Sequence, residues 1–332
     1  MLLRVGIALF DLPHRRARTL LSGGMPVYLS VNPVEYHGPH LSLHNDRLLS
    51  EGLIRGLGDR LQVRHDWPLV LADHLAVGVD PCPGPGSRPV SFSQVRRLVV
   101  DSCRSLRALG AQRVVLMTFH GAPLHNLALE AGAAWLRARG VAAIAPFHLV
   151  LAHMLDLRDV GQYADALAPI RDPDTRRRVA ARLPQDFHAG FFETSLALHW
   201  AEASVADSYG RLPPCPEPIP DPTISRLASA AEAMQQHTVA RELRFAAQAL
   251  GWQRLRPFPG YTSWPAPANR ESGAAFAGHI LRLYSEVVDD VLHGRAVPPR
   301  PIMPWTRWMT MGGRWPPSRS MDASDVLEPP ES

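Results

Sequence analysis

The chain has 332 residues, of which 46% are hydrophobic and 20% charged, and its formal net charge is +4. This composition excludes a disordered chain, because it supplies enough apolar material for one large domain or two small ones. All 35 basic residues are arginines, and they are scattered apart from short runs at 15–18 and 176–178. A nucleic-acid surface normally has a denser basic stripe with interleaved aromatics, so we expect no nucleic-acid partner.

Cysteine usage and hydropathy bear on the compartment. Cys82, Cys103 and Cys215 are far apart and form no C-x-x-C pair. This favours a reducing compartment and argues against a cysteine zinc site. Because no apolar run approaches the length of a membrane span and the N-terminus lacks the pattern of a signal peptide, we expect a cytoplasmic protein with no membrane partner.

Strands and helices alternate in the first half of the chain. Apolar runs at 5–10, 25–31, 69–71, 113–119 and 141–147 predict strands. Helical periodicity predicts helices from Asp46 onward, over 93–109 and over 126–138, with a Pro- and Gly-rich loop at 79–90. This alternation predicts an α/β fold of three α/β/α layers around a mostly parallel central sheet.

The second half has weaker signals. Residues 151–185 are polar and predicted to be irregular, and apolar stripes predict helices over 223–250 and 273–292. From residue 295 onward the chain has eight prolines and three tryptophans. We therefore predict one domain over residues 1–295 and a Pro/Trp-rich tail over 296–332 that is partly extended or disordered.

The candidate site residues begin in the stretch 35–46, which directly follows the strand at 25–31. If that strand continues to His37, Glu35 and His37 lie on one face, because side chains alternate along a strand. Asp46 comes where a helix begins, so it is either an N-cap or a ligand. His120 ends the strand at 113–119 and reaches the same sheet edge. Carboxylates and imidazoles that converge in this way are ligands for divalent metals.

Three motifs resemble the creatininase (creatinine amidohydrolase) family. The first is Glu-x-His-Gly-Pro-His-Leu-x-Leu-x-x-Asp at 35–46. The second, His120-Gly121 after a strand, is similar to the family's Gly-His-Gly-Gly-Asn turn. The third, His-Ala-Gly-Phe-Phe-Glu-Thr-Ser at 188–195, is similar to the family's His-Ala-Gly-x-x-Glu-Thr-Ser. The resemblance spans about residues 1–293.

The resemblance implies a hydrolase with two divalent metal ions, Zn²⁺, Mn²⁺ or Fe²⁺, that cleaves an amide or cyclic amide C–N bond of a small molecule. By position, Glu35, Asp46 and His120 match the ligands of one ion. His37 and Asp46 match ligands of the other, so Asp46 bridges the two, and His188 matches the catalytic histidine. Family members commonly form hexamers, which implies a homo-oligomer.

The sequence departs from the family in the turn after His120. Creatinine-hydrolysing members have a glutamate ligand where this chain has Ala122, and we expect Glu193 to replace it and to share in catalysis. His125 is a possible substitute ligand or substrate contact, although we favour a solvent-facing residue at a helix N-terminus. Those members also carry tryptophans before the catalytic histidine, and residues 151–187 contain none, so the predicted substrate is not creatinine.

Two other functions stay open from the sequence. One is a peptidase or maturation enzyme that acts on a small modified peptide. The other is an inactive family member that serves as a scaffold, an alternative raised by the altered turn at 121–126. The metal content of the purified protein separates the scaffold from both enzymes.

Overall fold

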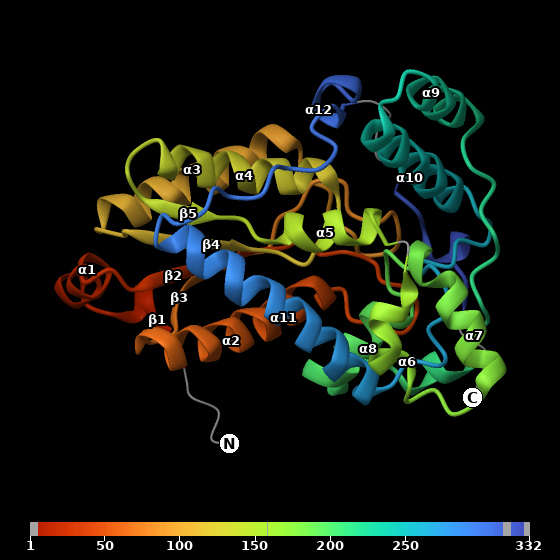
Figure 1. Cartoon of the computed structure of the whole chain (residues 1–332), viewed down its shortest axis with the longest axis horizontal. Coiled ribbons are helices and arrows are strands. Elements are labelled where there is room, and N and C mark those ends of the chain that lie inside the picture. Colours follow the sequence, from red (N-terminus) through yellow and green to blue (C-terminus); the bar gives the residue numbers. More distant parts are fainter. Residues whose placement is uncertain (1–5, 158, 315–319, 329–332) are drawn as a thin grey trace.

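A computed structural model describes residues 6–157, 159–314 and 320–328, and Figure 1 shows its arrangement. Its centre is a five-stranded sheet in the order β1-β3-β2-β4-β5, in which all neighbouring strands are parallel. The strands are β1 (Ile7–Ala8), β2 (Pro26–Val31), β3 (Val70–Leu75), β4 (Arg113–Met117) and β5 (Ala142–Ile144). The predicted α/β class with a parallel sheet is confirmed. The first predicted strand is shorter than expected, and its residue 5 lies outside the described residues.

Helices cover both faces of the sheet, as Figure 1 shows. Alternation along β2 sends Val27, Leu29 and Val31 into one core and Tyr28 into the other. The first core is closed by α1 (His14–Ser22), α3 (Phe92–Ala108) and α4 (Pro123–Arg137), and the second by α2 (Asn45–His65) and α11 (Arg270–Leu292). Because both faces are buried, the strands are continuous apolar runs.

A group of shorter helices lies beyond the carboxyl ends of the strands, on the right in Figure 1. It contains α5 (Phe147–Leu155), α6 (Ala164–Leu167), α7 (Pro173–Arg182), α8 (Phe191–Trp200), α9 (Pro222–Ala233) and α10 (His237–Gln253). The prediction that 151–185 is irregular is therefore largely wrong, because α6, α7 and part of α5 lie there. α6 and α7 are short and contain few large apolar residues, so their apolar period is weak.

The single helix predicted over 223–250 is also wrong. The chain turns between α9 and α10, where Gln235 has a φ of +59°, and the two helices pack against each other. Ala228 on α9 and Leu243 on α10 are both buried in this arrangement. In one straight helix these two residues would lie far apart along the axis. None of the helices in the described ranges is long and apolar enough to cross a membrane.

Part of the predicted tail packs on the rest of the chain. The carboxylate of Glu242 on α10 accepts hydrogen bonds from the Met303 backbone N–H (2.9 Å) and from Trp305 Nε1–H (2.6 Å). Glu242 and Met303 are buried, and α12 (Thr306–Met309) follows directly. Residues 315–319 and 329–332 of the tail lie outside the described residues, and the domain boundary at 295 stays a prediction.

We expect Trp305→Phe to destabilise the protein by about 1–2 kcal/mol, because it leaves one buried oxygen of Glu242 without its donor. For a chain of this size, this lowers the melting temperature by roughly 1–3 °C. Trp308→Phe is the matched control, since the Trp308 side chain is 78% exposed. Equal melting temperatures for the two variants, measured by calorimetry, would show that the Glu242 contact contributes nothing.

Candidate metal centre

The candidate ligands lie where the chain leaves the central strands. β2 ends at Val31, where the predicted strand ends, and it does not continue to His37 because Pro33 has no N–H to continue the sheet ladder. The chain instead turns back on itself, with Glu35 N–H bonded to Leu43 O (2.9 Å) and Gly38 at a φ of +67°. This turn keeps Glu35 and His37 buried beside each other at the carboxyl end of the sheet.

Glu35, Asp46 and His120 form the first ligand set. Glu35 comes from the turn after β2, Asp46 from the first turn of α2, and His120 from the loop after β4. His120 Nδ1 lies 2.7 Å from Glu35 Oε2 and 3.5 Å from Asp46 Oδ2, and all three side chains are buried. Their donor atoms are close enough to bind one cation.

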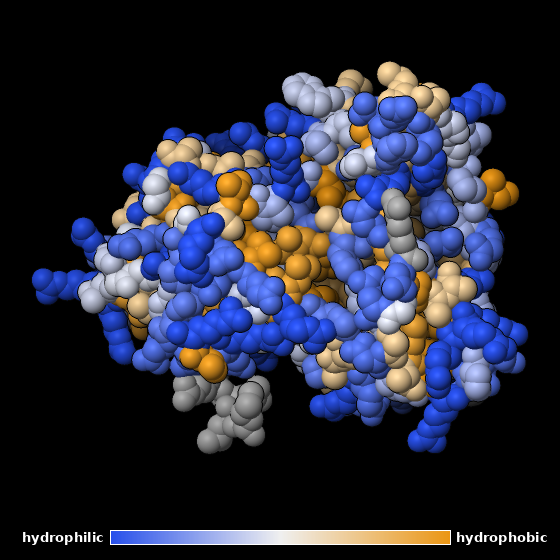
Figure 2. Space-filling view, in the orientation of Figure 1, coloured by the Kyte–Doolittle hydropathy of each residue, from blue (hydrophilic) through white to orange (hydrophobic). Residues whose placement is uncertain are grey.

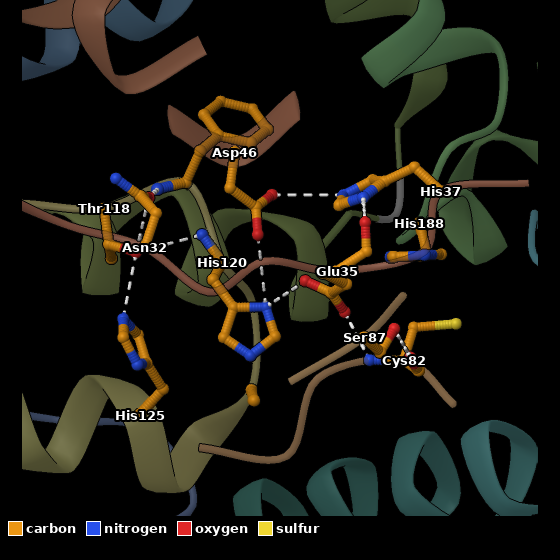
Figure 3. Close-up of polar contacts among 12 residues, drawn as sticks. Asn32, Glu35, His37, Asp46, Cys82, Ser87, Thr118, His120, His125 and His188 are labelled. Atoms are coloured by element: carbon orange, nitrogen blue, oxygen red, sulfur yellow. Dashed lines mark hydrogen bonds and ion pairs between the residues drawn. The ribbon is translucent and has the colours of Figure 1, made fainter. Parts of the chain in front are cut away.

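His37 and Glu193 lie on the other side of Asp46 (Figure 3 shows His37). His37 Nε2 is 3.2 Å from Asp46 Oδ1 and 3.8 Å from Glu193 Oε2. Together with His188 they form a second group of donors. The two oxygens of Asp46 therefore face different ligand sets, which is the arrangement required of a bridging carboxylate.

Backbone carbonyls fix the orientation of the three histidines. His37 Nδ1 is 3.1 Å from Glu35 O, His120 Nε2 is 2.9 Å from Val79 O, and His188 Nε2 is 2.9 Å from Tyr36 O. Because a carbonyl only accepts, each of these ring nitrogens must carry the proton. The other ring nitrogens of His37 and His120 face the carboxylates of Asp46 and Glu35, and they can accept a metal ion once the rings are neutral.

The carboxylates are held in place but not fully satisfied. Glu35 Oε1 accepts from Cys82 N–H (2.5 Å), and Glu193 Oε2 accepts from Ala189 N–H (2.6 Å). The buried atoms Glu35 Oε2 and Asp46 Oδ2 both lie near one group, His120 Nδ1, at 2.7 Å and 3.5 Å. Since a buried charge is costly unless it is paired or coordinates a metal, two carboxylate oxygens that share one ring nitrogen fit a cation between them and His120.

Helix N-termini also favour negative charge here. Asp46 lies in the first turn of α2 and Glu193 in the first turn of α8. At both places the helix presents free N–H groups and the positive end of its dipole. Burial by itself raises the pKa of Asp46, but His37 and His120 hold it below its ordinary value.

The electrostatics separate the histidines into two kinds. Burial lowers the pKa of His37, but Asp46, Glu35 and Glu193 outweigh it and raise that pKa to about 10. Glu35 and Asp46 likewise raise the pKa of His120 to about 9 against the effect of burial. The pKa of His188 is well below its ordinary value, because the ring is desolvated and faces His37. His188 is therefore a neutral base beside a charged cluster.

His125 does not lie where it was expected. It is fully buried in the first turn of α4, and its Nε2 lies 3.1 Å from Thr118 Oγ1 and 3.2 Å from Val31 O. The solvent-facing interpretation is wrong, because this turn packs against the end of the sheet. His125 belongs to none of the donor groups among the described residues, whereas Glu193 does. Asn126 donates from Nδ2 to His120 O (2.8 Å) and so steadies the altered turn.

A cavity of about 200 Å³ adjoins the cluster. Glu35, His120, His188 and Glu193 line it, together with residues that sequence reasoning missed, among them Cys82 and Trp252. The Trp252 ring lies 5.4 Å from that of His188, and its Nε1–H donates to Tyr261 O (2.9 Å). Cys82 belongs to the Pro- and Gly-rich loop at 79–90. No local pattern marks Trp252, which arrives through the packing of α10.

The fold is shared with solved creatininase structures. A creatininase with manganese has a TM-score of 0.54 at 18% identity, over 86% of this chain and 98% of that one. A crystal structure of creatinine amidohydrolase (creatininase) gives 0.52 at 20%, over 86% and 98%. The putative creatinine amidohydrolase of Bacteroides fragilis NCTC 9343 gives 0.53 at 15%, over 80% and 89%. At these identities the likeness concerns the fold.

The family of this chain is identified by its sequence. The family model for creatinine amidohydrolase matches residues 11–288, and the chain therefore belongs to the creatininase family of amidohydrolases. The resemblance drawn from the three motifs is confirmed. No curated protein matches the sequence.

Metal uptake should depend steeply on pH. With pKa values of about 10 and 9, His37 and His120 carry protons at neutral pH in the metal-free protein, and a cation must displace them. We expect the affinity for Zn²⁺ to rise about tenfold per pH unit for each displaced proton between pH 6.5 and 8.5. Competition with a chelating indicator measures this, and an affinity independent of pH would contradict the electrostatics described above.

Proposed function

We propose that the chain is a divalent-metal-dependent amidohydrolase that holds two ions and hydrolyses a C–N bond of a small amide or cyclic amide. The observation that carries this proposal is the position of Asp46 between two groups of donors. Its Oδ2 belongs to the group with Glu35 and His120, and its Oδ1 lies 3.2 Å from His37, which groups with Glu193 and His188. Zn²⁺, Mn²⁺ and Fe²⁺ all suit carboxylate and imidazole ligands. One similar creatininase structure contains manganese and another is of a Zn-Zn type, which supports the first two.

In this proposal Glu35, Asp46 and His120 hold one ion. Asp46, His37 and Glu193 hold the other, with Glu193 in place of the ligand that Ala122 cannot supply. Two ions held in this way would polarise a carbonyl and lower the pKa of a water molecule toward neutrality. The separation of Asp46 Oδ1 and Oδ2 between the two sets supports its role as the bridge.

His188 is the proposed proton carrier. Its Nε2–H is bonded to Tyr36 O, so Nδ1 is free to accept a proton, and the low pKa keeps the ring neutral before reaction. During hydrolysis the water oxygen bonds to the carbonyl carbon while a water proton passes to His188. The C–N bond then breaks with its electron pair on nitrogen, and His188 returns the proton there, which yields an acid and an amine.

The remaining parts of the function are also proposals. The substrate is a small molecule other than creatinine, in keeping with the absence of tryptophan from 151–187. The protein is proposed to be a cytoplasmic homo-oligomer, and the family resemblance implies a hexamer. The three unpaired, buried cysteines support a reducing compartment and do not bear on the oligomer. The scaffold alternative is disfavoured, because in a metal-free protein the buried charges of Glu35 and Asp46 would depend on His37 and His120 for compensation. Assays with small modified peptides as substrates distinguish the peptidase or maturation enzyme from the amidohydrolase.

Substitutions of Asp46 and His188 should differ in their effect on metal content. Asp46→Asn removes the bridging charge, so we expect it to lower occupancy at both sites. His188→Ala should leave about two ions per chain and reduce turnover by about 10²–10⁴. Elemental analysis of protein reloaded without chelator measures the first effect and needs no substrate. Loss of metal from His188→Ala with full retention in Asp46→Asn would reverse our assignment of ligand and base.

Glu193 should serve one site only. Glu193→Gln keeps the shape of the side chain but removes its charge, and we expect about one ion per chain to remain, bound by Glu35, Asp46 and His120. Glu202→Gln, a change at an exposed glutamate just beyond α8, is the matched control and should keep both ions. Two ions in Glu193→Gln would exclude Glu193 as a ligand.

A further inference from the structure

The cavity beside the metal centre has mainly aromatic walls. The metal-site residues form only one part of it, and the walls include Phe119, Phe147, Phe187, Phe192, Phe245 and Trp252. The rings contact one another: Phe187 lies 5.1 Å from Phe245 and 5.4 Å from Trp252, nearly perpendicular to both. Such an edge-to-face set makes a stiff apolar surface that a planar hydrophobic group can contact.

Charge is distributed unevenly around this cavity. Apart from the metal-site residues, the charged side chain among the described residues that line it is Asp80. No arginine of the described residues lines it. Away from the metal centre, an anionic group on a substrate would therefore be desolvated without a cationic side chain among these residues to pair with, which is costly. The walls favour an uncharged ligand.

Apolar surface continues beyond this cavity. A second cavity of about 150 Å³ shares Met154 and Phe192 with the first, and its walls include Val150, Leu157 and Ile280. Figure 2 shows the corresponding hydrophobic patch at the centre of the molecule, over α5 and α11. Met154 and Phe192 thus stand between the metal-site cavity and an apolar hollow at the surface.

We propose that the substrates are uncharged amides or cyclic amides that carry a hydrophobic group of at least aromatic-ring size. This inference rests on the proposed hydrolase function. The amide carbonyl would face the metal centre, while the hydrophobic group lies against Phe187, Phe245 and Trp252. A substrate of only a few polar atoms would leave these walls without contacts and gain little from them.

Hydroxamic acids test this proposal, because they bind metal ions through one end and carry any chosen group at the other. The full chain loaded with Zn²⁺ is titrated calorimetrically with acetohydroxamic, benzohydroxamic and 4-carboxybenzohydroxamic acid. We expect benzohydroxamic acid to bind at least tenfold more tightly than acetohydroxamic acid, because its ring is buried. The added carboxylate should weaken binding at least tenfold relative to the plain ring.

Two variants of α10 connect the preference to the aromatic walls. Phe245→Ala should reduce the ratio of benzo- to acetohydroxamate affinity several-fold, whereas Phe10→Ala, the same change at a 54% exposed site, should not. Ala249 also lines the cavity, so Ala249→Arg should supply the missing cation and reverse the preference toward the carboxylated ring.

The outcomes are distinguishable. Equal affinities for acetohydroxamic and benzohydroxamic acid, or tighter binding of the carboxylated ring to the unaltered chain, would overturn the substrate class and leave the metal site standing. The substrate class would also be overturned if Phe245→Ala left the ratio of benzo- to acetohydroxamate affinity unchanged and Ala249→Arg left the preference for the uncarboxylated ring unchanged. If none of the three compounds binds and the chain retains less than about half an ion after reloading, the proposed function itself fails and this inference fails with it.

Discussion

The site depends on one constraint: Asp46 is a buried carboxylate that must serve two groups of partners at once. Its Oδ1 lies 3.2 Å from His37 and its Oδ2 lies 3.5 Å from His120, on opposite sides of the carboxylate. Removing so many charged groups from water is unfavourable unless each is compensated. In the protein alone, protonated His37 and His120 provide part of that compensation, and bound cations would provide it more completely. The same cluster is therefore stable enough to fold and ready to exchange protons for metal.

The fold delivers these groups through ordinary features of a parallel sheet. β2 and β4 are neighbours, so the loops that follow them bring Glu35, His37 and His120 to one edge. Asp46 and Glu193 arrive in the first turns of α2 and α8, where the helix dipole favours a carboxylate. Backbone carbonyls then set the ring orientations. The aromatic wall is interleaved with the site residues along the chain, because Phe119, Phe187 and Phe192 directly precede His120, His188 and Glu193. Phe245 and Trp252 are added from α10.

Sequence reasoning succeeded where the signal was local. The apolar runs of the first half predicted the parallel sheet. The family resemblance of the motifs implied the set of Glu35, Asp46 and His120, which the fold does bring together. The reason given for Glu35 and His37 was nevertheless wrong, because Pro33 ends the ladder and a turn, not a strand, holds them. His125 and Trp252 could not be located, since the burial of one and the position of the other depend on tertiary packing. The break between α9 and α10 was likewise missed. It is marked by the positive φ of Gln235, which is a property of the folded backbone and not of the residue type.

The most direct measurement of the central claim is the electron paramagnetic resonance spectrum of the chain reloaded with Mn²⁺. If Asp46 bridges two ions, they lie within a few ångströms, as in other two-metal sites at about 3.5–4 Å. The account predicts an exchange-coupled spectrum that reaches full intensity at two Mn²⁺ per chain. A six-line spectrum of isolated Mn²⁺ that saturates at one ion per chain would contradict it.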